Sequence, residues 1–197
     1  MISFNRNNIF IHNQKCGGTS IEKSFFTREE YEFHYKNDKI FGKLYHSGIS
    51  SYIKQYDLDF AKKCTIFSSA RNPWSRIISF IFWRAKFKGV IIDNLTKDLF
   101  LSELYDPEQG IPLVTLKSCI GNNISPELNT PKSNILKIEN ITNELSEFCE
   151  RNNFSYQPVS TLNTSNHLHY RHYYDKETRD IIGDLFSDDI NFFNYDF

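Results

Sequence analysis

The residues best suited to chemistry lie near the start of the chain, between positions 9 and 21, where the sequence reads IFIHNQKCGGTSI. An apolar run leads to Lys15, and Gly17 and Gly18 follow before apolar residues recur at helical spacing from Ile21. This order predicts a strand, a tight loop and a helix. The two glycines allow positive φ and close backbone approach, so successive N–H groups can form an anion nest at the positive end of the helix. We therefore expect the loop to hold a phosphate-like group.

The side chains of this loop suit the same kind of ligand. Lys15 adds a positive charge, and Thr19 and Ser20 add two hydroxyl donors. Cys16 also lies inside the loop, where its thiol is either reactive or, as is commoner for a small loop residue, inert. The nucleotide pattern G-x-x-x-x-G-K-[ST] does not match, because Lys15 precedes both glycines. A glycine turn beside a solvated lysine is the alternative interpretation.

A second group of residues follows positions 65–67, an apolar run that suits a buried parallel strand. Asn72 is a good N-cap and Pro73 suits the first helical position, so we expect a helix to begin there. Arg71 then stands at the carboxyl end of the strand, and Ser79 lies about two turns into the helix on the side of the cap. One bound anion can touch both residues. The alternative is a buried ion pair for Arg71 and an ordinary helical position for Ser79.

Cys64 and Arg71 also invite comparison with a phosphatase loop, in which a cysteine nucleophile precedes an arginine. Such a loop has one residue fewer between the two, and the run here is strand-like and lacks glycine. We therefore exclude a cysteine phosphatase.

His46 lies directly before apolar residues that recur at i, i+3, i+4 and i+7 from position 49. This spacing predicts an amphipathic helix over 49–56, with Ser47 as its N-cap. His46 is therefore expected at an edge and not in a core. A surface or capping role is the alternative to a catalytic one.

The elements that must position these residues alternate along the chain. A third buried strand is expected at 135–138, followed by a helix with an apolar stripe from 141 to 148. Strand and helix alternate three times, which favours βαβ units with right-handed crossovers. We expect an α/β protein with a three-layer P-loop-like fold, a central parallel β-sheet flanked by helices, in one domain over 1–197. Ligands of such sheets bind beyond the carboxyl ends of the strands, where Lys15 and Arg71 both fall.

Three other segments complete the expected organisation. A helix is predicted at 94–105 and another from Asp175. Between 106 and 132, prolines, glycines and an Asn-Asn pair break any periodic pattern. We expect this stretch to be a long loop, suited to act as an acceptor-binding lid.

The composition limits the partners. A net charge of -1 and a pI near 6.6 argue against a general nucleic-acid binder. The longest apolar stretch, 77–83, is too short to span a bilayer, and no signal-peptide pattern begins the sequence, so we expect a soluble, cytoplasmic protein. Widely spaced cysteines and a histidine cluster at 167–172 without carboxylate or thiol partners at ligand spacing argue against a disulfide framework and a metal site.

Four stretches, in order, resemble one known family. K-x-G-G-T-S at 15–20 resembles the 5′-phosphosulfate loop of sulfotransferases that use 3′-phosphoadenosine 5′-phosphosulfate (PAPS), and ARNPWSRIIS at 70–79 resembles their second motif. The segment around His46 and the closing run 163–197 resemble the carbohydrate branch of that family. A proline usually precedes the lysine there, where this chain has Gln14.

The resemblance implies transfer of a sulfuryl group from PAPS to an acceptor hydroxyl on a carbohydrate, by in-line displacement without a metal. Adenosine 3′,5′-bisphosphate (PAP) is the implied product. The implied catalytic residues are Lys15, which donates to the departing oxygen, and His46, a general base whose ordinary pKa is about 6.5. The residues implied to bind the donor are Lys15, Cys16, Gly17, Gly18, Thr19 and Ser20 at its 5′ end, Arg71 and Ser79 at its 3′-phosphate, and Arg171 and Tyr173 at a phosphate or the adenine.

Two other classes of function remain open. A non-catalytic module that binds PAPS or PAP would carry the same phosphate motifs. An ATP-using relative of the P-loop kinases is the other, although the order of lysine and glycines counts against it.

Overall fold

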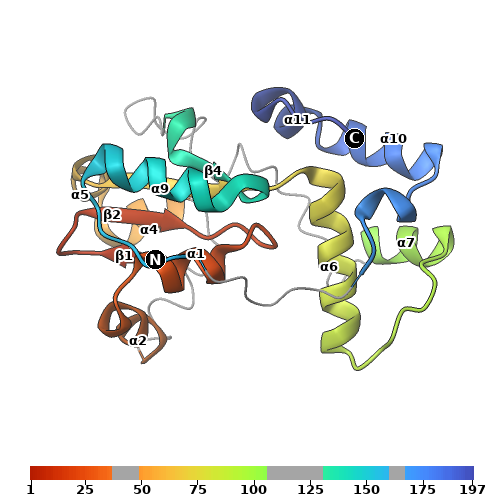
Figure 1. The fold of residues 1–197 in the computed structure, drawn as a ribbon, viewed down its shortest axis with the longest axis horizontal. Helices are drawn as coiled ribbons and strands as arrows, with labels where there is room; N and C mark the ends of the chain where they lie inside the picture. Colours follow the sequence, from red (N-terminus) through yellow and green to blue (C-terminus); the bar gives the residue numbers. More distant parts are fainter. Residues whose placement is uncertain (37–48, 106–130, 160–166) are drawn as a thin grey trace. The chain divides into compact units, whose positions relative to one another are not determined.

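The computed structural model of the chain describes residues 1–36, 49–105, 131–159 and 167–197 (Figure 1). The chain forms two compact units, each built from two separate stretches of sequence. The first unit contains residues 1–70 and 116–162, and the second contains residues 71–115 and 163–197.

Short apolar strands form the sheet of the first unit. In their order across the sheet, the strands are β1 (Ile2–Ser3), β2 (Asn8–Ile11), β3 (Thr65–Ala70) and β4 (Ile135–Lys137). β1 runs antiparallel to β2, whereas β2, β3 and β4 are parallel, with Ile9 opposite Ile66. The carboxyl ends of these three strands therefore share one edge of the sheet.

Helices cover both faces of this sheet (Figure 1). They are α1 (Gly18–Phe25), α2 (Arg28–Lys36), α4 (Ile49–Tyr56), α5 (Leu58–Lys63) and α9 (Ile141–Asn152), with short 3-10 turns η2 (Lys132–Asn134) and η3 (Ile138–Asn140) on either side of β4. Successive side chains of a strand point to opposite faces. Accordingly, Phe10 and Phe67 pack with α1 and α9, while Ile9 and Ile66 pack with α4 and α5.

The long helix α6 organises the second unit. The elements of this unit are α6 (Pro73–Phe87), α7 (Lys97–Leu104), η4 (Tyr170–Tyr173), α10 (Lys176–Leu185) and α11 (Ser187–Phe193). Ile77 and Ile81 of α6 are buried with Phe100 of α7 and Ile182 of α10. One apolar core therefore joins segments that are far apart in the sequence.

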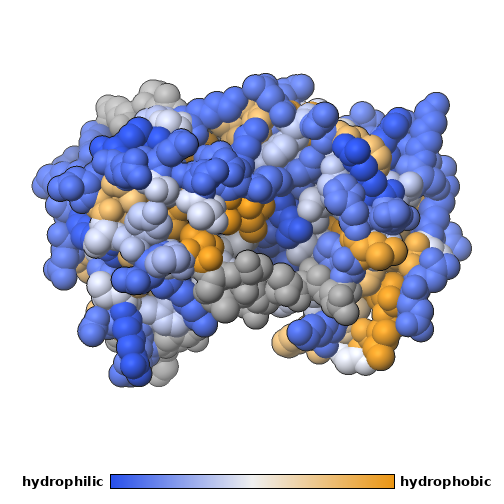
Figure 2. Space-filling view, in the orientation of Figure 1, coloured by the Kyte–Doolittle hydropathy of each residue, from blue (hydrophilic) through white to orange (hydrophobic). Residues whose placement is uncertain are grey.

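The carboxyl end of α6 presents apolar side chains to solvent. Trp83 and Phe87 are exposed there with Val90 and Ile91 of the following segment, and the rings of Trp83 and Phe87 stack. Figure 2 shows apolar surface, in orange, around this end of α6. Within the described part of the chain, no helix is both long and apolar enough to cross a bilayer.

The mixed α/β class and the mostly parallel sheet flanked by helices confirm the coarse fold prediction. The edge strand β1 was not predicted. It forms because the turn that ends at Asn7, whose φ is 48°, returns the chain antiparallel to β2. The P-loop-like identity of the fold and its organisation as one domain stay predictions.

Candidate functional site

The loop after β2 enters α1 through two residues in the left-handed conformation. The carbonyl of Asn13 accepts a hydrogen bond from the Cys16 N–H at 3.3 Å, closing a turn in which Lys15 has a φ of 61°. Gly17 follows with φ 71° and ψ 15°, and α1 begins at Gly18, earlier than the apolar spacing indicates. A left-handed residue followed by right-handed ones turns consecutive N–H groups toward one side, as in an anion nest.

Three backbone donors of this loop have no acceptor among the described residues. They are the N–H groups of Gly17, Gly18 and Thr19. The N–H groups of Ser20 and Ile21 both donate to the Gly17 carbonyl, at 3.0 and 3.2 Å. The first N–H groups of a helix carry partial positive charge and have no intrahelical acceptor. The start of α1 therefore supplies three adjacent donors suited to an anion.

Both glycines of the loop are required by their surroundings. A Cβ on Gly17 would lie 2.3 Å from Ile138 Cδ1, and the positive φ of Gly17 already disfavours any side chain. A Cβ on Gly18 would lie 2.4 Å from Nε2 of the His12 ring. Gly18 does not have a positive φ, so close approach alone is the reason for glycine there.

The remaining loop side chains differ in exposure. Lys15, Thr19 and Ser20 are half-buried, whereas Cys16 is fully buried. The Cys16 thiol donates to the Gln14 carbonyl at 3.5 Å. Because the thiol is buried, we infer that it is inert. Cys16 then contributes to the loop through its backbone alone.

The buried side-chain amide of Asn13 anchors the start of the loop to the neighbouring strand β3. Asn13 Nδ2 donates to Ser68 Oγ and to the Ser69 carbonyl, both at 2.8 Å. Ser68 Oγ in turn donates to the Ile11 carbonyl at 2.8 Å. These bonds tie the carboxyl ends of β2 and β3 together where the loop begins.

The second unit contains the predicted arginine and serine. Arg71 is half-buried directly after β3, and its Nε donates to Ser75 Oγ at 3.0 Å. Asn72 Oδ1 accepts from the Ser75 N–H at 3.4 Å and Pro73 opens α6, which confirms the predicted cap. Ser79 is buried one turn beyond Ser75 on the same face of α6, about 6 Å further along its axis. Ser75 therefore holds Arg71 Nε at the start of the helical face on which Ser79 lies.

The two C-terminal candidates lie in this same unit and contact its closing segment. Arg171 is exposed, and its guanidinium donates to the Phe197 carbonyl. The Tyr173 hydroxyl accepts from the Leu168 N–H at 2.9 Å. Asn72 Nδ2 donates to the Asp196 carbonyl at 2.7 Å, so the end of the chain is held at the start of α6.

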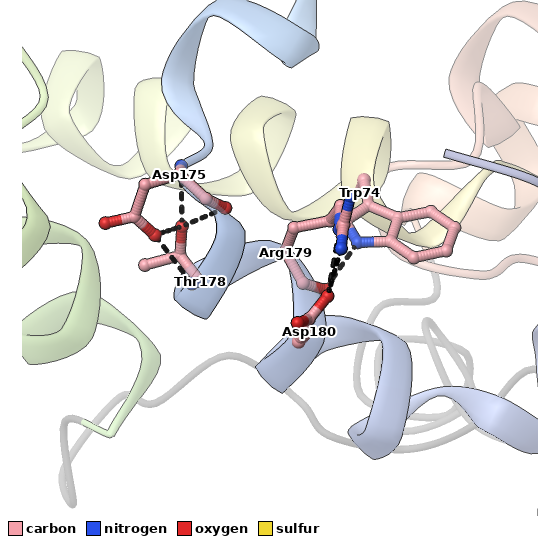
Figure 3. A network of polar contacts seen from close by, with 5 residues as sticks. All are labelled: Trp74, Asp175, Thr178, Arg179 and Asp180. Carbon is pink, nitrogen blue, oxygen red and sulfur yellow. Dashed lines mark hydrogen bonds and ion pairs between the residues drawn. The ribbon is translucent and has the colours of Figure 1, made fainter.

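A further set of contacts holds α10 against the start of α6 (Figure 3). Trp74 Nε1 donates to the Arg179 carbonyl at 2.9 Å, and the Tyr174 hydroxyl donates to the Trp74 carbonyl at 2.9 Å. Asp175 and Thr178 form a capping box, which confirms the predicted start of this helix. The turn that carries Arg71 and Ser75 is thus supported from the C-terminal helices.

Three further predictions concern the general base and the lid, a metal site, and a cysteine phosphatase. His46 and positions 106–130 of the expected lid lie outside the residues that the structure describes. In the described ranges, no group of three or more histidines, cysteines and carboxylates could hold a metal ion. Burial raises the pKa of the Cys64 thiol to about 11, which disfavours the thiolate that a cysteine phosphatase requires.

The roles of three residues near these sites, His12, Glu22 and Ser75, were not predicted from the sequence. His12 Nδ1 lies 2.9 Å from Glu22 Oε1 in the interior, and Ser75 contacts Arg71. A signal for Glu22 was present, because it shares a helical face with Phe25 and Phe26, where an unpaired carboxylate would be costly. Ser75 was recognisable as the position one turn before Ser79.

Comparison of the chain with models of protein families, with curated proteins and with solved structures found no match in any of the three.

Proposed function

We propose that this chain is a PAPS-dependent sulfotransferase that transfers a sulfuryl group to an acceptor hydroxyl, with a carbohydrate as the acceptor. The observation that carries the proposal is the run of N–H groups at Gly17, Gly18 and Thr19, which have no acceptor in the described ranges and lie next to Lys15, beyond the end of β2. Parallel sheets bind ligands at this edge. A Cβ at Gly18 would collide with the buried His12 ring, so the loop backbone packs directly against the interior.

The proposed reaction converts PAPS and an alcohol into a sulfate ester, PAP and a proton. The acceptor oxygen bonds to sulfur as the bond from sulfur to the bridging oxygen breaks, and His46 takes the hydroxyl proton. Lys15 donates to the bridging oxygen, and the loop N–H groups hold the 5′-phosphate to which that oxygen belongs. Removal of one preorganised donor of this kind typically lowers turnover by about 10²–10³-fold.

The second unit supplies the proposed selectivity for the donor. PAPS differs from ATP by its 3′-phosphate, and a guanidinium matches the geometry of a phosphate. Arg71 is oriented through Nε by Ser75, on the helical face that also carries Ser79. We assign the 3′-phosphate to Arg71 and Ser79, with Arg171 and Tyr173 as further contacts of the nucleotide.

Thermal unfolding with PAP, and with ADP and AMP as controls, tests the donor assignment. A ligand at 100 times its Kd adds about 2.7 kcal/mol to the free energy of unfolding, which raises Tm by roughly 5–11 °C at this chain length. We expect this shift with PAP and not with ADP or AMP. Arg71→Ala should abolish the shift, whereas Arg28→Ala, at an exposed arginine of α2, should retain it.

The other outcomes separate the two remaining classes of function. Equal shifts with ADP and PAP would favour the ATP-using alternative, and no shift with PAP would refute the donor assignment. A PAP shift without sulfate transfer to a broad panel of oligosaccharides would identify a binding module. Sulfuryl transfer in this mechanism uses no metal, so we expect activity to persist in EDTA, whereas magnesium-dependent transfer from ATP would stop.

A further inference from the structure

Beneath the anion loop lies a buried pair of side chains, His12 and Glu22. The His12 side chain is 5% exposed and that of Glu22 is fully buried, with Nδ1 and Oε1 2.9 Å apart. A carboxylate of this pair can only accept a hydrogen bond, so Nδ1 of the imidazole donates. His12 follows β2 and Glu22 belongs to α1, so the pair joins the two elements that the loop connects.

The imidazole also contacts the backbone at the start of the helix. A Cβ added to Gly18 would lie 2.4 Å from both Cδ2 and Nε2 of His12 and 2.6 Å from Cε1. The ring therefore lies directly under Gly18, the middle one of the three residues whose N–H groups have no acceptor in the part of the chain that the structure describes. Any tilt or displacement of the ring would alter the path of this backbone.

Stability alone does not explain the pair. Glu22 Oε2 is buried and has no hydrogen-bond partner in the described part of the chain. A buried carboxylate that leaves one oxygen unsatisfied is costly, and apolar residues of similar size commonly stabilise such a position as well or better. Glu22 is fully buried on α1, where an apolar side chain of similar length would fill the position without leaving an oxygen unsatisfied.

We propose that His12 and Glu22 are positioning residues of the anion loop. Glu22 fixes the orientation of the imidazole, and the imidazole fixes the backbone of Gly17, Gly18 and Thr19 so that their N–H groups face one anion. The identity of that anion, the 5′-phosphate end of PAPS, rests on the proposed function. The role of His12 and Glu22 in ordering the loop backbone does not depend on the proposed function.

A set of variants at Glu22 tests this role. Glu22→Gln keeps an oxygen that accepts from Nδ1, whereas Glu22→Met has a similar length and no acceptor. We expect Glu22→Met to weaken PAP binding about tenfold, the lower end of the loss that follows removal of an outer hydrogen bond to a metal ligand. Glu22→Gln should bind PAP within about threefold of the unmodified protein. Leu145→Ala, which empties a buried position on α9 in the same unit, controls for a loss of stability.

A second measurement needs no ligand. The Ser20 and Ile21 amides donate to the Gly17 carbonyl, so their hydrogen exchange reports on the order of the loop. Both amides should exchange at least about tenfold faster in Glu22→Met, while the amides of α9 keep their rates. His12→Asn, which keeps a donor near Nδ1 but lacks the part of the ring under Gly18, should have the same effect if Glu22→Met does not fold.

The outcomes distinguish failure of this inference from failure of the proposed function. Unchanged exchange at Ser20 and Ile21 in Glu22→Met, or in His12→Asn where Glu22→Met does not fold, overturns the positioning role. So does a loss of PAP affinity in Leu145→Ala as large as that in Glu22→Met. If the unmodified protein does not bind PAP, the proposed function fails, and the exchange rates still decide whether the pair orders the loop.

Discussion

Lys15 combines a positive side chain with a backbone conformation that lysine seldom adopts. Its φ of 61° places it in the left-handed region, which costs a residue with a Cβ about 1–2 kcal/mol. Strained residues of this kind persist where the surrounding structure holds them, and they gather at functional sites. A glycine or asparagine would fit the turn better, so we attribute the choice of lysine to its amino group.

Two variants at Lys15 should differ in stability but lose PAP affinity alike. Lys15→Gly removes the strain and Lys15→Ala keeps it, so the glycine variant should be more stable than the alanine variant by about 0.5–1 kcal/mol. Both variants lose the amino group and should lose PAP affinity to a similar extent. Urea unfolding and calorimetric titration measure the two effects. A glycine variant that binds PAP like the unmodified protein would remove Lys15 from the site.

His46 is the proposed general base of the reaction. His46→Ala should lower the rate of sulfate transfer from radiolabelled PAPS by roughly 10²-fold or more, because the acceptor loses its general base. The affinity for PAP should change little, since the donor is held elsewhere. His172→Ala, at an exposed histidine of η4, is the matched control. Unaltered turnover in His46→Ala would exclude His46 from this role.

The start of α6 depends on Asn72. Its Oδ1 caps the helix and its Nδ2 holds the Asp196 carbonyl, so one buried side chain joins the helix to the end of the chain. Arg71 and Ser75 flank this cap. The order of the proposed 3′-phosphate site therefore depends on a residue that need not touch the ligand.

Two substitutions at Asn72 separate these contributions. Asn72→Ala loses both the cap and the donor and should lower the free energy of unfolding by about 2 kcal/mol. Asn72→Ser restores a capping oxygen without the amide donor and should recover about half of that loss. Thermal unfolding monitored by circular dichroism gives both values. Equal Tm values for the two variants would show that the cap contributes nothing to stability.

The sheet of the first unit encloses a titratable group that the composition of the chain does not reveal. The Met1 amino group donates to the Phe10 carbonyl at 2.6 Å and to the Tyr52 hydroxyl at 2.8 Å. Desolvation lowers the pKa of this amino group from 8.0 to about 5, while the charge of Glu22 opposes the shift. Antiparallel pairing of β1 with β2 is what carries the group into the interior.

The stability of a polypeptide that starts at Met1 should therefore depend on pH. Between pH 5 and 8 the unfolded chain binds more protons at this group than the folded chain, so the free energy of unfolding rises with pH. The slope from this group is at most about 1.4 kcal/mol per pH unit, and it vanishes above pH 8 and below pH 5. The chain contains one methionine, so isotope-labelled methionine reports on this group alone in a nuclear magnetic resonance titration. An inflection near pH 8 in the folded protein would contradict the prediction.

Much of the local architecture could be predicted from the sequence. The strand, loop and helix around Lys15, the cap at Asn72 and the helix after Asp175 are confirmed, because each depends on neighbouring residues and on rules that act within one helical turn. The parallel pairing of β2, β3 and β4 followed from the alternation of strands and helices. The side chain of Asn140, which directly precedes α9, makes no capping hydrogen bond, although asparagine is common at that position.

Only the tertiary structure decided how residues distant in sequence support the candidate sites. The contact of His12 with Glu22 and Gly18, the burial of the Met1 amino group, and the bond from Asn72 to Asp196 join separate elements. Side-chain order along the chain determines which face of a helix or strand is apolar. It does not determine which polar groups share the interior, because that depends on how those faces meet when the chain packs.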